Sequence, residues 1–218
     1  MTGSDDIYGV GNYTVGIQDE NDKLLWVLYM IDSNNRAYYT VNGKIKECED
    51  HIRTDQIEWY RETSDQIKQA HGPVPAMAFF HIPLPEYTDA WLFEPCLGDR
   101  GEHVTAATLN SGFFAAAMEQ GDIKGMFVGH DHTNSFAANV FGITLHCCRC
   151  TSYEVPIGDT PRGGRMITLM PDGTFESYTL LHVRSDLQKE GEPKAYRQHE
   201  TYSAPYYNRF QFCLPENK

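Results

Sequence analysis

The sequence predicts one α/β domain in which mixed, mostly antiparallel β-sheet layers are flanked by helices. Apolar runs with strand character alternate with helical periodicity up to Val128, and strand-like runs joined by short turns then continue to Val183. A length of 218 residues with 41% hydrophobic and 22% charged residues is ordinary for one globular domain. We expect the domain over residues 1–184 and a polar tail over 185–218.

The chain opens with two runs rich in Val, Ile, Leu, Tyr and Trp, Tyr8–Ile17 and Leu24–Asp32. The acidic turn Asp19–Asp22 separates them, which predicts a β-hairpin. The second run is apolar nearly throughout, as is typical of a strand covered on both faces. The polar segment 33–50 is expected to be a surface excursion.

Two helix-to-strand units follow. The first has Thr54 as expected N-cap, helical spacing up to Ala70, and then the apolar strand 76–80. A long loop is expected over 87–109. The second has a short helix ending at Gln120 and the strand 123–128. Four further strands are then expected at 135–141, 143–148, 165–170 and 175–183.

Charge and cysteine usage exclude several classes of protein. A net charge of −12 with no basic run argues against nucleic-acid and anionic-membrane partners. Six cysteines are too few for a disulfide scaffold, and the Cys147, Cys148 and Cys150 cluster is expected to be free thiols on a strand. The polar start and the lack of a 20-residue apolar run favour a cytoplasmic chain.

Histidines follow both buried strands. The run Gly129-His130-Asp131-His132 comes directly after strand 123–128, and His81 comes directly after strand 76–80. Ligands of open α/β sheets bind at the carboxyl edge of the strands, and imidazole is a common metal ligand. The sequence therefore predicts that His81, His130 and His132 meet at one edge and bind metal there.

At these residues the chain resembles a known family. Phe80-His81-Ile82-Pro83-Leu84-Pro85-Glu86-Tyr87 and Val128-Gly129-His130-Asp131-His132 are similar to the last two signature blocks of calcineurin-like metallophosphoesterases, in the purple-acid-phosphatase-like branch of plants and fungi. The similarity extends more loosely from Tyr8 to about Tyr178. It implies the carboxyl-terminal half of that family's αββα sandwich.

The resemblance also implies a metal site. The family holds two ions (Fe, Zn or Mn) that together activate a water for attack on phosphorus. His81 and His130 would ligate one ion and His132 the other. The three earlier blocks, D-x-H, G-D-x-x-D and G-N-H followed by an acid, are not found, since Tyr13 follows Gly11-Asn12. The general acid is therefore expected upstream of this chain, and at most one ion is expected here.

Three neighbours are weaker candidates for the site. Asp131 is expected to shape the turn or orient an imidazole rather than to ligate a metal. Asn134 is expected to bond the loop backbone, and His103 to lie on the surface or to touch substrate. The bulky run from His146 to Tyr153 stands where relatives usually have glycines, which would alter the shape of the pocket.

The expected function is the carboxyl-terminal part of a metal-dependent phosphoesterase acting on phosphorylated small molecules or phosphoproteins, with little or no activity by itself. Two alternatives stay open: a non-catalytic binding or regulatory module, and a mononuclear three-histidine zinc hydrolase. An incomplete sandwich would also leave a sheet face uncovered, so association through that face is expected.

Overall fold

The structure is a computed structural model that describes residues 6–155, 157–183 and 194–207. Its elements in chain order are β1 (Tyr13–Gln18), β2 (Leu24–Met30), β3 (Arg36–Val41), β4 (Lys44–Glu49), α1 (Thr54–His71), β5 (Ala76–Phe79), α2 (Pro85–Phe93), β6 (Cys96–Asp99), α3 (Phe113–Gln120), β7 (Ile123–Val128), β8 (Ser135–Val140), β9 (Ile143–Cys147), β10 (Gly163–Leu169), β11 (Phe175–His182), β12 (Ala195–Arg197) and β13 (Tyr202–Ser203).

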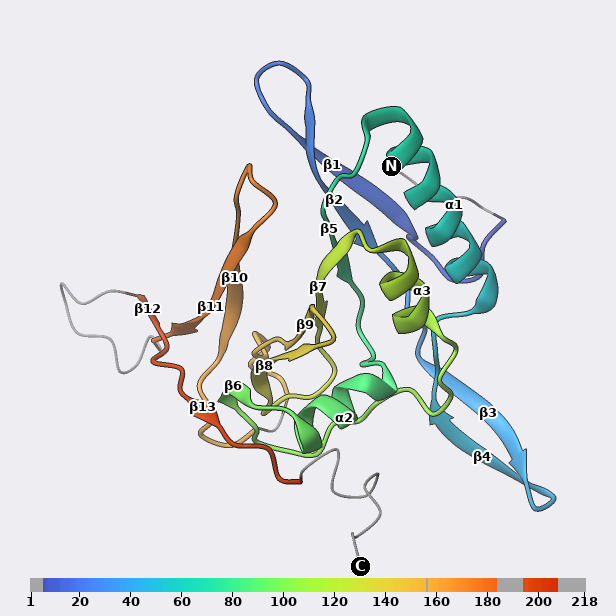
Figure 1. The fold of residues 1–218 in the computed structure, drawn as a ribbon. Helices are drawn as coiled ribbons and strands as arrows, with labels where there is room; N and C mark the ends of the chain where they lie inside the picture. The colour runs from blue at the N-terminus through green and yellow to red at the C-terminus, as the bar shows by residue number, and fades with distance from the viewer. Residues whose placement is uncertain (1–5, 156, 184–193, 208–218) are drawn as a thin grey trace, which may run out of the picture.

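A large sheet organises the described part of the chain (Figure 1). Its strand order is β1-β2-β5-β7-β9-β8-β6-β13. Strands β2, β5, β7 and β9 are parallel neighbours, and the other four pairings are antiparallel. The smaller sheets β10-β11-β12 and β3-β4 are antiparallel. The predicted mixed, mostly antiparallel α/β architecture is confirmed.

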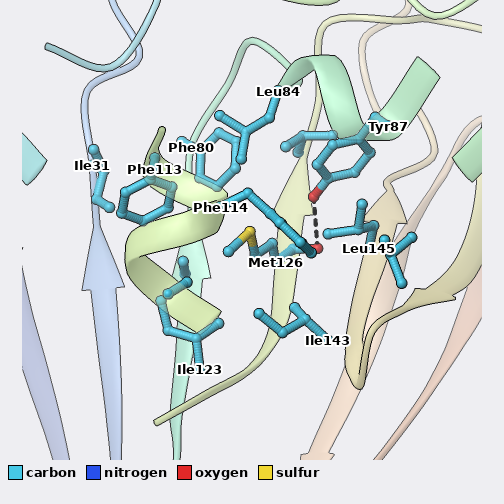
Figure 2. Close-up of a cluster of buried hydrophobic side chains, with 14 of the residues drawn as sticks. Ile31, Phe80, Leu84, Tyr87, Phe113, Phe114, Ile123, Met126, Ile143 and Leu145 are labelled. Carbon is cyan, nitrogen blue, oxygen red and sulfur yellow. Dashed lines mark hydrogen bonds between the residues drawn. The ribbon is translucent and has the colours of Figure 1, made fainter. Parts of the chain in front are cut away.

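Helices α1 and α3 lie over one face of the sheet, and the β10-β11 hairpin lies against the other (Figure 1). The helix-side core contains Tyr60 from α1, Phe113 from α3 and Met126 from β7. Tyr87 of α2 crosses this core and donates its hydroxyl hydrogen to the Met126 carbonyl oxygen at 2.9 Å (Figure 2). The buried Tyr87 side chain and its hydrogen bond thus fix the position of α2 relative to β7, the strand that leads to His130.

The opposite face is covered unevenly. Trp26, Met77 and Phe127 are buried there beneath the β10-β11 hairpin. Val15 and Ile17 of β1 pair with Leu28 and Trp26, so they point to the same face, yet they remain 40% and 37% exposed. The sandwich on this side is partial, and the predicted association through this face stays a prediction.

Segment 33–50, predicted to be a surface excursion, takes the form of the protruding hairpin β3-β4 (Figure 1). Its turn residues Asn42 and Gly43 have φ angles of 51° and 73°. Asn-Gly favours the type I′ turn, which forms the two-residue loop of a β-hairpin, because both residues tolerate positive φ. The signal was present in the sequence.

The predicted long loop over 87–109 was also wrong in part, because it contains most of α2 and all of β6. Pro85 occupies the first turn of α2, where a proline needs no N–H partner and its fixed φ suits the helix. Strand β6 is held from both sides, by β8 and β13, so partners distant in sequence stabilise it.

Smaller differences concern element ends. Residues 8–12 precede β1 rather than extending it. Arg53, not Thr54, is the N-cap of α1, and Gln56 accepts the Arg53 backbone N–H at 2.7 Å. The described part of the predicted tail, residues 194–207, pairs with β11 of the three-stranded sheet through β12 and with β6 of the large sheet through β13. The rest of that tail lies outside the described residues.

Candidate metal centre

Strands β5 and β7 bring His81 and His130 to the same edge of the sheet. The two strands are parallel and pair Phe79 with Phe127, so the loops after them leave side by side. The Gly129 N–H donates to the His81 carbonyl oxygen at 3.2 Å, which ties one loop to the other. The first two histidines predicted to meet are therefore brought together.

Ser33, just after β2, holds the His81 loop. Its hydroxyl oxygen accepts the backbone N–H groups of His81 at 3.1 Å and Ile82 at 2.8 Å. Ser33 is itself 2% exposed, so the anchor is protected from water. Three parallel strands thus contribute to the position of one imidazole.

The two imidazole rings approach each other edge to face. His130 Nδ1 lies 3.3 Å from His81 Nε2, with ring centroids 5.1 Å apart and planes at 82°. Two ligands of a tetrahedral ion with bonds of ~2.0–2.1 Å are separated by about 3.3–3.4 Å, so this spacing matches one edge of such a tetrahedron.

His130 lies in a strained turn. Its φ angle is 68°, and the Asp131 N–H donates to the Gly129 carbonyl oxygen at 2.9 Å across it. A residue with a β-carbon rarely adopts this conformation, which costs on the order of 1–3 kcal/mol and occurs preferentially at functional sites. The turn aims the His130 ring at His81.

The pKa of His81 is lowered, first by burial and then by the positive charges that His130 and His132 would carry. A lowered pKa keeps the imidazole neutral, which is the form that ligates metal. Gly129 leaves room for this ring, since a β-carbon at residue 129 would lie 3.3 Å from His81 Nδ1.

His132 lies on the same cleft as the other two histidines but is exposed. The cleft has a volume of about 560 Å³. Arg149 and Arg165 also line it, yet their guanidinium groups bind Asp99 and Glu200. Both arginine side chains are almost fully buried, so their charges are largely neutralised within the protein.

The weaker candidates have other contacts. Asp131 is buried and accepts hydrogen bonds from the Thr105 N–H and the Asn134 side-chain amide, both at 3.0 Å. Asn134 is fully buried and accepts the Glu102 N–H at 3.1 Å. His103 packs on the Trp91 ring with centroids 4.9 Å apart. These contacts anchor the loop, and the structure does not bring His103 to the cleft.

Glu49 is an acidic side chain of this site that the sequence reasoning missed. Its Oε2 atom lies 3.3 Å from His130 Nε2. Glu49 ends β4, in the segment predicted to be a polar excursion, so no local pattern connected it with residue 130. The Asn42-Gly43 pair would have indicated only that the chain reverses direction before residue 49.

The described residues fit a metal in part. His81 and His130 offer two nitrogen donors at a suitable separation. However, within residues 6–155, 157–183 and 194–207 no group of three His, Cys, Asp or Glu side chains is arranged to hold an ion. The three-imidazole set needed by a mononuclear zinc hydrolase is therefore not found in the part of the chain described.

Known proteins resemble this chain over about two thirds of its length. It is 37% identical over 152 residues to "Probable inactive purple acid phosphatase 29" of Arabidopsis thaliana, covering 64% of this chain and 38% of that protein. It is 32% identical over 152 residues to "Probable inactive purple acid phosphatase 14" of the same plant, covering 64% and 37%.

A yeast protein extends the comparison to fungi. Over 143 residues the chain is 35% identical to "Phosphatase DCR2" of Saccharomyces cerevisiae, covering 61% of this chain and 23% of that protein. No protein-family model matches the chain. The chain thus spans less than two fifths of the length of these relatives. Among the described residues, no helix has the length and hydrophobicity needed to cross a bilayer. Over the matched residues, the chain is a homologue of the purple-acid-phosphatase-like proteins.

Proposed function

We propose that this chain supplies the histidine side of a metal-dependent phosphoesterase site that hydrolyses phosphate monoesters. His81 and His130 would hold one ion, and His132 would contribute to a second. The remaining ligands would come from segments other than the described residues. By itself the chain would bind a metal ion weakly and hydrolyse little or no substrate.

One observation carries the proposal: two imidazole nitrogens from separate loops face each other 3.3 Å apart at the carboxyl edge of parallel strands. Relatives named as purple acid phosphatases and as a phosphatase add support at the level of the family. The strained His130 turn adds more, because backbone strain of this kind occurs preferentially at functional sites.

In a complete site, two bound ions would polarise the phosphate ester and lower the pKa of the attacking water. The residues of this chain would position and hold those ions. Ser33 fixes the His81 loop, and the Gly129-to-His81 backbone bond couples the two loops. Holding donors at a fixed separation reduces the entropy lost when an ion binds.

The test combines metal titration with an activity assay on the whole chain. Calorimetry with Zn²⁺ or Mn²⁺ should show weak binding of about one ion, and His81→Ala or His130→Ala should weaken it at least ~10-fold. His71→Ala is the matched control, because His71 is an exposed histidine at the end of α1. Equal Zn²⁺ or Mn²⁺ affinity in all three variants would contradict the proposed metal site.

The activity assay uses a generic aryl phosphate with each metal added. Little or no hydrolysis is expected from this chain, since the described residues contain no group of three His, Cys, Asp or Glu side chains arranged to hold an ion. Rapid turnover that disappears in His130→Ala would contradict the expected dependence on further segments while upholding the enzyme class.

A second candidate is a non-catalytic binding module with the same fold. It is favoured by the words "probable inactive" in the names of two relatives and by the absence of a third donor in the described part of the chain. A folded chain that shows no Zn²⁺ or Mn²⁺ binding at millimolar concentration would favour this module over the metal site.

A further inference from the structure

Glu49 has a buried carboxylate oxygen that lies close to the His130 ring. The residue is 9% exposed, and its Oε2 atom has no hydrogen-bond partner among the described residues, yet it lies 3.3 Å from His130 Nε2. A buried carboxylate oxygen without a donor costs free energy, so this oxygen requires a partner. An N–H group on His130 Nε2 could be that donor.

Glu49 is fixed from several sides. It pairs with Arg36 across the β3-β4 hairpin, and Arg36 also binds its Oε1 atom. The Thr108 N–H donates to the Glu49 carbonyl oxygen at 3.2 Å, which holds the backbone against the loop before α3. The carboxylate therefore approaches His130 from a rigid position rather than from a flexible arm.

The chemistry of a carboxylate determines which His130 nitrogen carries hydrogen. An ionised carboxylate only accepts hydrogen bonds, so a neutral His130 must carry its hydrogen on Nε2 to satisfy Glu49. The lone pair is then on Nδ1, the atom that faces His81 Nε2. A metal ion shared by the two rings needs that lone pair.

We propose that Glu49 is a positioning residue that fixes the Nε2–H tautomer of His130 and so presents the Nδ1 lone pair to the metal position. This inference rests on the proposed function. It gives the β3-β4 hairpin a role in the site, because Glu49 is its last residue. A carboxylate behind a metal-binding histidine raises metal affinity by about 10–100-fold.

The decisive variant is Glu49→Met, which keeps the length of the side chain and removes the acceptor. Glu47→Met is the matched control. Glu47 lies on the same strand and also pairs with Arg36, but its side chain is 55% exposed. Both variants lose one charge and one partner of Arg36, and only the first removes the contact with His130.

The first readout needs no metal. Long-range ¹H–¹⁵N spectra of the metal-free chain report which ring nitrogen of His130 carries hydrogen. The parent and Glu47→Met should show the Nε2–H tautomer, and Glu49→Met should show a mixture. An unchanged tautomer in a folded Glu49→Met chain would overturn the inference. If that variant does not fold, Glu49→Gln serves instead, with a neutral acceptor and a smaller shift toward the mixture.

The second readout is Zn²⁺ affinity by calorimetry, with Co²⁺ absorption spectra as a measure of the ligand set. Glu49→Met should bind about 10–100-fold more weakly with an unchanged Co²⁺ spectrum, and Glu47→Met should stay within about twofold of the parent. A changed spectrum would make Glu49 a ligand and overturn the positioning role. If the parent does not bind Zn²⁺ but Glu49→Met still shifts the tautomer, the proposed function is overturned. The effect of Glu49 on the His130 tautomer is then upheld.

Discussion

The two ends of β7 carry polar clusters of opposite character. Just before the strand, Asp122 accepts hydrogen bonds from the hydroxyl groups of Tyr29 at 3.2 Å, Tyr60 at 2.5 Å and Ser64 at 2.8 Å. Just after it, the His130 ring lies beside His81 and beside a Glu49 carboxylate oxygen that has no hydrogen-bond partner among the described residues. The first cluster is saturated and relaxed, whereas the second is unsaturated and strained.

The difference separates a structural cluster from a functional one. Burial and the nearby charge of Asp122 raise the pKa of both tyrosines, so the hydroxyls stay protonated and keep donating. They join β2 and α1 to the start of β7. At the histidine end, a buried carboxylate acceptor without a hydrogen-bond partner and a positive φ angle lower stability, which is the pattern expected of a binding site.

The largest expected effect is at the saturated cluster. Asp122→Ala leaves three hydroxyl groups without their acceptor, so we expect the free energy of unfolding to fall by about 3 kcal/mol. Urea denaturation measures it. Asp172→Ala is the control, because Asp172 bonds only within its own turn and is exposed. A loss below about 1 kcal/mol for Asp122→Ala would remove the contrast between the two ends.

The next effect tests strain at the unsaturated end. Glycine adopts a φ angle of 68° without the steric cost of a β-carbon. We expect His130→Gly to be more stable than His130→Ala by about 1 kcal/mol, the reverse of the usual order. Both variants lose the imidazole and its contact with Glu49, so the pair isolates the backbone. Thermal and urea unfolding measure the difference, and the usual order would show that the turn is unstrained.

A third prediction concerns His146, a buried histidine on β9 that is not part of the cleft cluster. It stacks on Phe127 with ring centroids 4.3 Å apart, and burial and Arg165 lower its pKa well below the usual value. The unfolded chain binds a proton there below about pH 6.5, which the folded chain resists. The contribution of neutral His146 to the free energy of unfolding is therefore complete above that pH and is lost as the pH falls.

Between ~pH 7 and ~pH 5.5, the parent chain should lose about 1 kcal/mol more stability than His146→Phe, because only the parent can gain this proton on unfolding. Phenylalanine keeps the stacking on Phe127. Urea denaturation across this pH range measures the difference. Identical pH profiles would mean that His146 is protonated in the folded chain.

The smallest expected effect is a change of one methyl group. Gly129→Ala places a β-carbon 3.3 Å from His81 Nδ1, so the ring must shift by a few tenths of an ångström. We expect stability within about 0.5 kcal/mol of the parent and Zn²⁺ affinity several-fold lower. Gly164→Ala is the control, since the nearest neighbour of the added β-carbon lies at 3.8 Å. Gly142→Ala is unsuitable, because the φ angle of Gly142 is positive.

The sequence predicted the strands that carry the site, because β5 is apolar throughout and β7 ends in the apolar run Met126-Phe127-Val128. It also predicted that His81 and His130 share an edge, since parallel neighbours end together. It did not predict β6 or β13, because pairing between residues about a hundred positions apart leaves no local pattern.

The contacts within the site were less predictable. The φ angle of His130 and the approach of Glu49 depend on how two loops and a hairpin pack, and no periodicity encodes either. Asp131 illustrates the same limit, because its neighbours Thr105 and Asn134 were needed to show that its carboxylate anchors the loop.

Strand β13 has a consequence for how the molecule is made. Residues 202 and 203 pair with 97 and 96, so β6 gains its outer neighbour only after about a hundred further residues have left the ribosome. Until then its backbone groups are open to any passing strand, including one from another nascent copy. The interval between the synthesis of β6 and the arrival of β13 is therefore when a chaperone would protect this protein most effectively.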